Sequence, residues 1–75
     1  MSNVTTDEIR NIKPGATEAF HCDSSKMYAV ATALSTLKRR GLPDGVVDYE
    51  HRKYFDKDII VIRALRVGDE PVLNP

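Results

Sequence analysis

The segment 24–43 contains neither aspartate nor glutamate, although acidic residues are spread over the rest of the chain. It carries four cations, which are Lys26, Lys38, Arg39 and Arg40, whereas the remainder has seven cations against eleven acids. The formal net charge of zero therefore hides a basic segment attached to an acidic body. A net charge of zero argues against a protein that coats nucleic acid through bulk positive charge.

Cysteine and long apolar runs are also scarce. The single cysteine, Cys22, cannot form an internal disulfide, which agrees with a reducing compartment. The longest apolar runs, Met27–Ala31 and Ile59–Ile62, are too short to span a bilayer. The polar N-terminal stretch MSNVTTDEIR lacks the apolar region of a signal peptide. We therefore expect a cytoplasmic protein that does not contact a membrane.

Motifs for catalysis and metal binding are missing from the sequence. The soft metal ligands are His21, Cys22 and His51, without Cys-x-x-Cys or His-x-x-x-His spacing, and neighbouring strand residues point to opposite faces. We interpret Cys22 as a buried filler and His21 as a solvent-facing residue. No phosphate-binding glycine loop or nucleophile elbow is present, and one helix leaves little room for a substrate cavity of roughly a few hundred Å³. We expect a non-enzyme without metal, cofactor or small-molecule substrate.

The segment 25–40 has the periodicity of an amphipathic helix. Apolar residues recur at steps of three and four, which at about 100° per residue form one stripe. The stripe consists of Met27, Val30, Ala31, Leu34 and Leu37. The stretch 23–25 (DSS) supplies capping side chains at the start, and Gly41 followed by Pro43 ends the helix.

Three segments predict β-strands. They cover residues 16–22 (ATEAFHC), 46–55 (VVDYEHRKYF) and 59–67 (IIVIRALRV). In 46–55, polar residues alternate with Val47, Tyr49 and His51, as in a half-buried strand. The order predicts the α+β class and a β-α-β-β pattern, in which a three-stranded sheet carries one amphipathic helix packed on one face.

The expected domain organisation has three parts. Residues 1–12 form a flexible N-terminal segment, 13–67 a single α+β domain, and 68–75 a loose C-terminal tail. Within the first part, Thr5 and Glu8 have the spacing of a capping box, which is typical of a short helical turn.

The strand that begins at residue 59 is apolar on both faces, which predicts a central position in the sheet. Because one helix covers only one sheet face, the other face needs a further cover. We predict a homodimer whose interface consists of Ile59, Ile60, Val61 and Ile62. In the alternative, the N-terminal segment or the final PVLNP folds back as a lid.

The helix side opposite the apolar stripe carries hydroxyls and a guanidinium, and it has no carboxylate. Solvated helix faces usually mix Glu with Lys, whereas hydroxyls, Lys and Arg make many of the contacts to phosphate backbones. This pattern predicts a contact surface for DNA or RNA. Its residues are Tyr28, Thr32, Ser35, Lys38, Arg39 and Arg40. In the simpler alternative, the cations of the last turn only complement the helix dipole, by ~0.3–1 kcal/mol.

A second group of cations lies on the expected hairpin. It comprises Arg52, Lys53, Arg63 and Arg66. Since Asp48 and Glu50 are interleaved with them, we favour cross-strand pairing, which is worth up to ~1 kcal/mol per pair.

Three stretches suggest a family: IRNIKPG before the first strand, SKMYAVATALSTLKRRG in the helix, and IIVIRAL at the end of the hairpin. Over about residues 9–65, the sequence resembles the small, mostly uncharacterised accessory proteins that bacteriophages and mobile elements carry. The resemblance implies a compact accessory protein that acts on nucleic acid or on another protein. Our first hypothesis is a non-enzymatic nucleic-acid-binding accessory protein. The second is a protein-binding module, such as an inhibitor or assembly factor, that acts through a dimeric sheet or an acidic surface.

Overall fold

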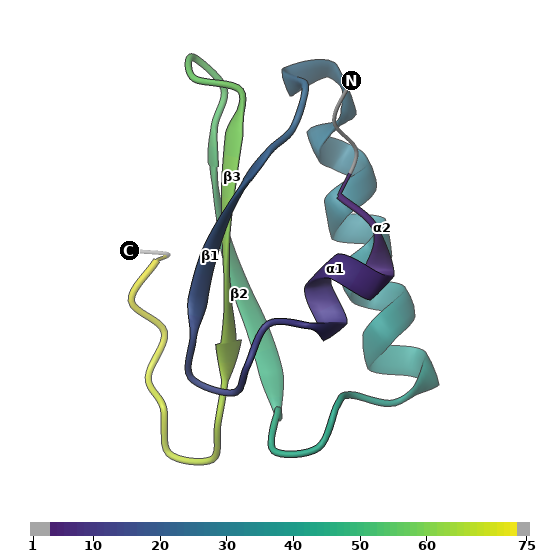
Figure 1. The fold of residues 1–75 in the computed structure, drawn as a ribbon, viewed down its shortest axis with the longest axis vertical. Helices are drawn as coiled ribbons and strands as arrows, with labels where there is room; N and C mark the ends of the chain where they lie inside the picture. Colours follow the sequence, from purple (N-terminus) through teal and green to yellow (C-terminus); the bar gives the residue numbers. More distant parts are fainter. Residues whose placement is uncertain (1–3, 74–75) are drawn as a thin grey trace.

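A computed structural model describes residues 4–73 of the chain (Figure 1). Its elements in order are α1 (Thr6–Arg10), β1 (Thr17–His21), the 3₁₀ turn η1 (Ser24–Lys26), α2 (Met27–Arg40), β2 (Asp48–Tyr54) and β3 (Ile59–Leu65). The predicted α+β class, with a three-stranded sheet and one main helix, is confirmed. Within residues 4–73, no helix has the length and apolar character needed to cross a bilayer.

The sheet has the strand order β1-β3-β2, and β3 runs antiparallel to both neighbours. Ile62 lies opposite Glu18 on β1 and opposite His51 on β2. The predicted central position of the Ile59–Ile62 strand is therefore confirmed. Since both edge strands oppose β3, β1 and β2 run in the same direction, and α2 forms the connection between them.

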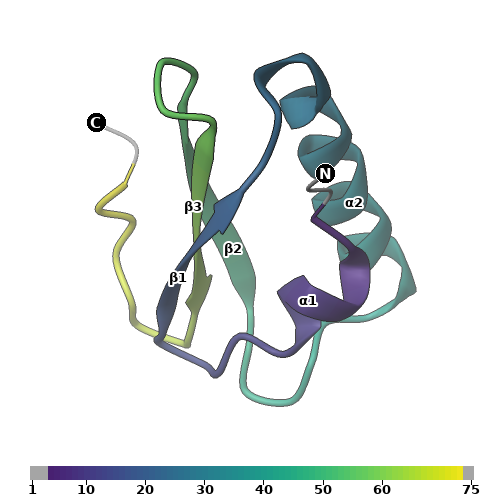
Figure 2. The same ribbon diagram turned by 45° about the horizontal axis from the view of Figure 1, so that its top comes forward.

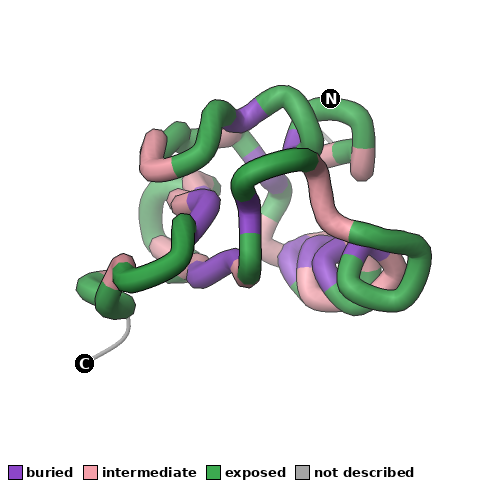
Figure 3. The backbone as a smooth tube through the Cα atoms, turned by 90° about the horizontal axis from the view of Figure 1, so that it is seen from below, coloured by how far each residue is buried: buried purple, intermediate pink, exposed green. Residues whose placement is uncertain are grey.

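The molecule is arranged in layers. Both helices lie on one side of the sheet, and the C-terminal segment after β3 lies on the other side (Figures 1 and 2). Buried residues gather between α2 and the sheet, and exposed residues lie on the outside (Figure 3). The sheet is thus covered by the helices on one face and in part by the C-terminal segment on the other.

The predicted stripe of α2 forms one side of the core. Met27, Val30, Leu34 and Leu37 are buried, and the opposing sheet contributes residues such as Ile60 and Ile62. Asp23 caps the start of this region, because its carboxylate accepts a hydrogen bond from the Ser25 N–H. At the other end, Gly41 has a φ of 117° and its N–H donates to the Leu37 carbonyl, which ends the helix as expected.

The N-terminal region belongs to the domain, although it was expected to be flexible up to residue 12. Thr5 and Glu8 form the predicted capping box, with the Glu8 N–H 3.2 Å from the Thr5 hydroxyl oxygen. Ile9 and Ile12 are almost fully buried, because α1 closes the side of the core that α2 leaves open. The described part of the domain therefore begins at the first helix; residues 1–3 lie outside the described residues.

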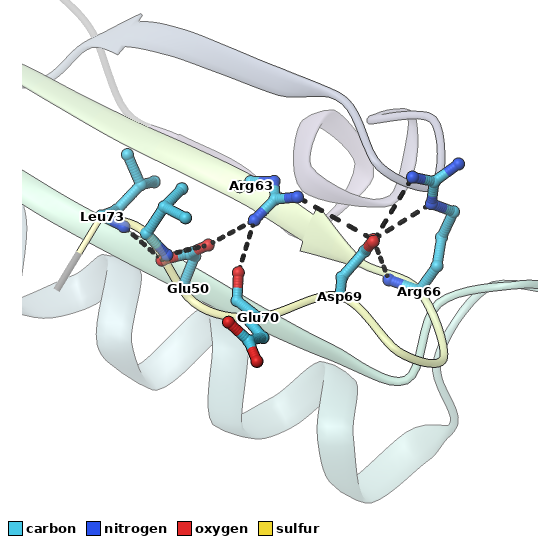
Figure 4. Close-up of polar contacts among 7 residues, drawn as sticks. Glu50, Arg63, Arg66, Asp69, Glu70 and Leu73 are labelled. Carbon is cyan, nitrogen blue, oxygen red and sulfur yellow. Dashed lines mark hydrogen bonds and ion pairs between the residues drawn. The ribbon is translucent and has the colours of Figure 1, made fainter.

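The C-terminal segment is held against the sheet, so the prediction of a loose tail over 68–75 is wrong for residues 68–73. The carboxylate of Glu50 accepts hydrogen bonds from the N–H groups of Val72 and Leu73, at 2.8 and 2.6 Å (Figure 4). Arg63 bridges to Glu50 at 3.0 Å and donates to the Glu70 carbonyl. The alternative of a C-terminal lid is thus observed for this part of the sheet face.

Glu50 departs from the predicted alternation of polar and buried residues on its strand. It lies on the face away from the helices, yet only 4% of it is exposed. Burial by itself raises the pKa of Glu50, but hydrogen bonds from the Leu73 N–H, Arg63 and the Val72 N–H outweigh it and lower the pKa below its ordinary value. The buried carboxylate is therefore charged and is the anchor of the C-terminal segment.

Candidate nucleic-acid interface

The outer face of α2 is a hydroxyl-rich surface without acidic residues. Tyr28, Thr32, Ser35 and Arg39 follow one another at steps of four, three and four, so they share the side opposite the buried stripe. All four are exposed, and Tyr28 exposes 73% of its surface. No hydrogen bond between residues 4–73 uses the hydroxyl of Tyr28, Thr32 or Ser35. We call these four residues the α2 outer face.

Lys38 belongs to a different surface from the α2 outer face. Its ammonium group lies 2.8 Å from the carboxylate of Asp48 on β2, with both side chains about half exposed. The hydrogen bond from Lys38 is the main reason that the pKa of Asp48 lies below its ordinary value. Such an exposed ion pair stabilises the fold by only ~0.2–1 kcal/mol. The charge of Lys38 is therefore partly neutralised, but the pair is easily broken.

Arg40 points to a third place, between the two helices. It lines a cavity of about 110 Å³ together with Arg10 from the end of α1. The other lining residues are Thr6, Thr36, Leu37 and Gly41. The structure thus separates the last three cations of α2: Lys38 pairs with the sheet, Arg39 faces solvent, and Arg40 lines a cavity that Arg10 also lines.

Sequence reasoning missed Arg10, Thr6 and Thr36 as possible site residues. A signal was present, because the stretches TDEIR and TLKRR both place a threonine four residues before an arginine. Residues four apart share a helix face, so each helix presents a hydroxyl next to a guanidinium. The sequence does not reveal that the two pairs meet, since this depends on how α1 packs on α2.

The cations of the hairpin are mostly engaged within the protein. Arg63 pairs with Glu50 as predicted, whereas Arg66 pairs with Asp69 at 3.0 Å rather than across the strands. Arg52 lies over the ring of Tyr54, 5.3 Å from its centre. Among residues 4–73, the predicted cross-strand pairing is confirmed for Arg63 with Glu50, whereas Asp48 pairs with Lys38 of α2 instead of with a cation of the hairpin.

A groove of about 570 Å³ lies between α2 and β2. The sequence predicted too little room for a cavity of this size, because the separation of the helix from the edge strand does not follow from the pattern. Ser35 and His51 both line the groove, but no hydrogen bond within residues 4–73 joins them. Burial and the nearby Lys53 and Lys38 lower the pKa of His51.

The remaining soft ligands do not form a metal site. Among residues 4–73, no group of three His, Cys, Asp or Glu side chains is placed to hold an ion. Cys22 is buried, and burial together with the neighbouring Asp23 and Asp58 raises the pKa of its thiol. A buried thiol with a raised pKa is a weak nucleophile and a poor metal ligand at neutral pH.

The four residues predicted at an oligomer interface are divided between the two faces of the sheet. Ile60 and Ile62 are fully buried against the helices and are not available to a partner. Ile59 and Val61 are half-buried on the opposite face, where they line a shallow cavity of about 260 Å³ with Tyr54 and Lys57. This uncovered half of the sheet face, beyond the reach of the C-terminal segment, is the open sheet half.

Comparison of the chain with protein-family models, curated proteins and solved structures yields no match. The functional interpretation therefore depends on where the charged, hydroxyl and apolar groups lie. Two surfaces stand out: the α2 outer face with its adjoining arginines, and the open sheet half.

Proposed function

We propose that this protein is a small non-enzymatic nucleic-acid-binding accessory protein, and that the α2 outer face contacts the phosphate backbone. One observation carries the proposal: the α2 outer face offers three hydroxyls and a guanidinium, and the 14-residue helix carries no carboxylate. The resemblance of the sequence to phage and mobile-element accessory proteins implies a role of the same kind.

The groups on this surface match the chemistry of a nucleic-acid backbone. Hydroxyl, Lys and Arg side chains supply many of the hydrogen bonds to phosphate oxygens, and Arg39 adds a fixed positive charge. The exposed ring of Tyr28 offers a face on which an unstacked base of a single strand could lie. Within residues 4–73, no ion pair engages Arg39, so it can bind a ligand without breaking an internal contact.

Binding of fluorescently labelled single- and double-stranded DNA and RNA tests the proposal by anisotropy. We expect affinity to fall steeply with salt, since each phosphate contact releases counterions. Arg39→Gln should weaken binding and reduce the slope of log K against log salt by about one unit. Lys57→Gln is the matched control, because it removes one exposed cation from the distant β2–β3 turn and should change neither quantity.

Two results would contradict the proposal. One is the absence of binding to all four nucleic acids at low salt. The other is a loss of binding in Lys57→Gln that equals or exceeds the loss in Arg39→Gln, which would move the contact to the sheet.

A second candidate function is protein binding through the open sheet half, most simply by self-association. The observation that favours it is the half-buried state of Ile59 and Val61, beside the exposed Ala19 on the neighbouring β1. The exposed Phe55 lies in the turn at the same end of the sheet. Apolar groups left uncovered in this way are common at protein interfaces.

A further inference from the structure

The cavity between the two helices is lined by the same pair of residue types, one threonine and one arginine, from each helix. Thr6 and Arg10 are four residues apart on α1, and Thr36 and Arg40 are four residues apart on α2, so each helix presents one hydroxyl and one guanidinium on one face. Both faces line the same cavity of about 110 Å³. This volume is larger than a single water needs, and it leaves room for one small tetrahedral oxyanion.

The charge of this cavity is not balanced by the protein. None of the lining residues is acidic, and no ion pair within residues 4–73 involves Arg10 or Arg40. Two like charges that face one space repel each other unless an anion lies between them. By contrast, Lys38, Arg63 and Arg66 each have a carboxylate partner.

The helix dipole does not explain this arrangement completely. Arg10 and Arg40 each occupy the last turn of a helix, where a cation is stabilising. That effect accounts for each arginine alone, since a side chain anywhere near the helix end satisfies it. It does not require that both arginines line one cavity, nor that two threonines line the same cavity.

We propose that this cavity binds a phosphate monoester, such as the terminal phosphate of a nucleic acid. The two guanidinium groups donate paired hydrogen bonds to its oxygens, which is the preferred geometry of arginine with phosphate. The Thr6 hydroxyl can donate a further hydrogen bond to the phosphate. The Thr36 hydroxyl instead donates to the Thr32 carbonyl at 3.0 Å, so Thr36 only lines the cavity. A monoester carries nearly two negative charges at pH 7, which matches two arginines better than the single charge of a diester does.

This inference deepens the proposed function, because Arg39 on the α2 outer face is adjacent to Arg40 in the cavity. The two claims nevertheless involve different residues. A free phosphate ion needs only the cavity, whereas a strand without a terminal phosphate needs only the α2 outer face. The tests below separate them for this reason.

The first test is a titration of the whole protein with inorganic phosphate at constant ionic strength, followed by amide chemical shifts. We expect saturable shifts at Thr6, Thr36 and Gly41. Arg10→Gln and Arg40→Gln should each weaken the affinity for phosphate at least fivefold, while the unfolding temperature stays within about 5 °C of the wild-type value. Arg39→Gln should leave the affinity for phosphate unaltered. Affinity should also fall as the pH drops from 7.5 to 5.5, since inorganic phosphate loses its second negative charge over this range.

The second test compares an oligonucleotide with a 5′-phosphate and the same strand with a 5′-hydroxyl. We expect a preference for the phosphorylated strand that disappears in Arg10→Gln, whereas Arg39→Gln weakens both strands equally. Saturable phosphate binding without any oligonucleotide binding would support the cavity and reject the proposed function. Linear phosphate shifts, or an equal loss of phosphate affinity in Arg39→Gln, would overturn the phosphate site even if oligonucleotides bind.

Discussion

Two polar side chains on β2 are buried, and they differ in how their polar atoms are satisfied. The Glu50 carboxylate accepts hydrogen bonds from Arg63 and from two backbone N–H groups. The Tyr49 hydroxyl is also buried but has no hydrogen-bond partner among residues 4–73. Burial raises the pKa of Tyr49 despite the opposing effect of Arg10, so the phenol stays protonated. An unsatisfied buried hydroxyl costs ~1–3 kcal/mol, whereas a satisfied carboxylate stabilises its surroundings.

Tyr49→Phe is therefore expected to leave the protein as stable as before or up to ~1 kcal/mol more stable, because it removes an unsatisfied group without changing the packing. Chemical denaturation gives the free energy of unfolding. Tyr28→Phe, at the exposed end of α2, is the control and should change it by less than ~0.5 kcal/mol. A loss of more than ~1 kcal/mol in Tyr49→Phe would show that its hydroxyl has a partner.

Among the elements, the C-terminal segment depends most on contacts with residues far away in the sequence. Residues 66–73 form no helix or strand, and Glu50 and Arg63 from two different strands hold this part of the segment. Arg66 and Asp69 fix the turn at its start, where the Arg66 N–H donates to the Asp69 carboxylate at 2.8 Å. The segment therefore depends on the charge of one buried carboxylate.

Glu50→Gln should lower the free energy of unfolding at pH 7 by ~1–3 kcal/mol, since hydrogen bonds to a charged acceptor are the stronger kind. The folded-state pKa of Glu50 is lowered, so its stabilisation is complete above the ordinary value of ~4.3 and is lost as the pH falls through the folded pKa. The gap between wild type and variant should thus shrink between pH 7 and pH 3, as measured by urea denaturation.

Glu70→Gln is the control for this experiment, because the bond at residue 70 uses the backbone carbonyl and not the side chain. It should change the stability by less than ~0.5 kcal/mol at pH 7. An equal gap between Glu50→Gln and wild type at both pH values would contradict the role of the charged carboxylate.

The elements differ in how far the sequence predicts them. α2 follows from local information alone, since its apolar stripe, the Asp23 cap of the preceding η1 turn and its end at Gly41 lie within or directly beside the segment. The tail could not be predicted, because backbone N–H groups hold it and carry no side-chain signature. The bond from Leu73 to Glu50 also joins residues 23 positions apart.

In the candidate site, too, some features follow from the local sequence and others depend on how the elements pack together. The exposed hydroxyls of the α2 outer face follow from helical spacing, and so does the position of Arg39. The pairing of Lys38 with Asp48 depends on the packing of α2 beside β2. Arg10 and Arg40 line one cavity because α1 packs beside the end of α2, whereas the sequence predicted a flexible segment at this position.

At the scale of the whole molecule, the layers separate two surfaces. The helices lie on one side of the sheet and the C-terminal segment lies on the other (Figures 1 and 2). The α2 outer face is therefore on the helix side, and the open sheet half is on the opposite side. A ligand on one surface leaves the other accessible. Binding of nucleic acid and association with a second copy are therefore compatible.

We expect self-association through the open sheet half to be weak. A stable dimer buries ~800 Å² per partner, and the C-terminal segment already covers part of this face. Sedimentation velocity should show a dimer that grows with protein concentration. Val61→Asp should abolish it, while Val67→Asp, at an exposed position after β3, should not. A monomer at every concentration would contradict self-association.

The most direct measurement for the central claim is a map of amide chemical shifts on addition of a short unlabelled single-stranded oligonucleotide at low salt. If α2 contacts the backbone, the largest shifts will follow helical spacing at Tyr28, Thr32, Ser35 and Arg39. They should vanish in Arg39→Glu while the spectrum remains that of the folded protein. Shifts confined to the sheet around Ile59 and Val61, or no shifts at all, would contradict the assignment of α2 as the nucleic-acid interface.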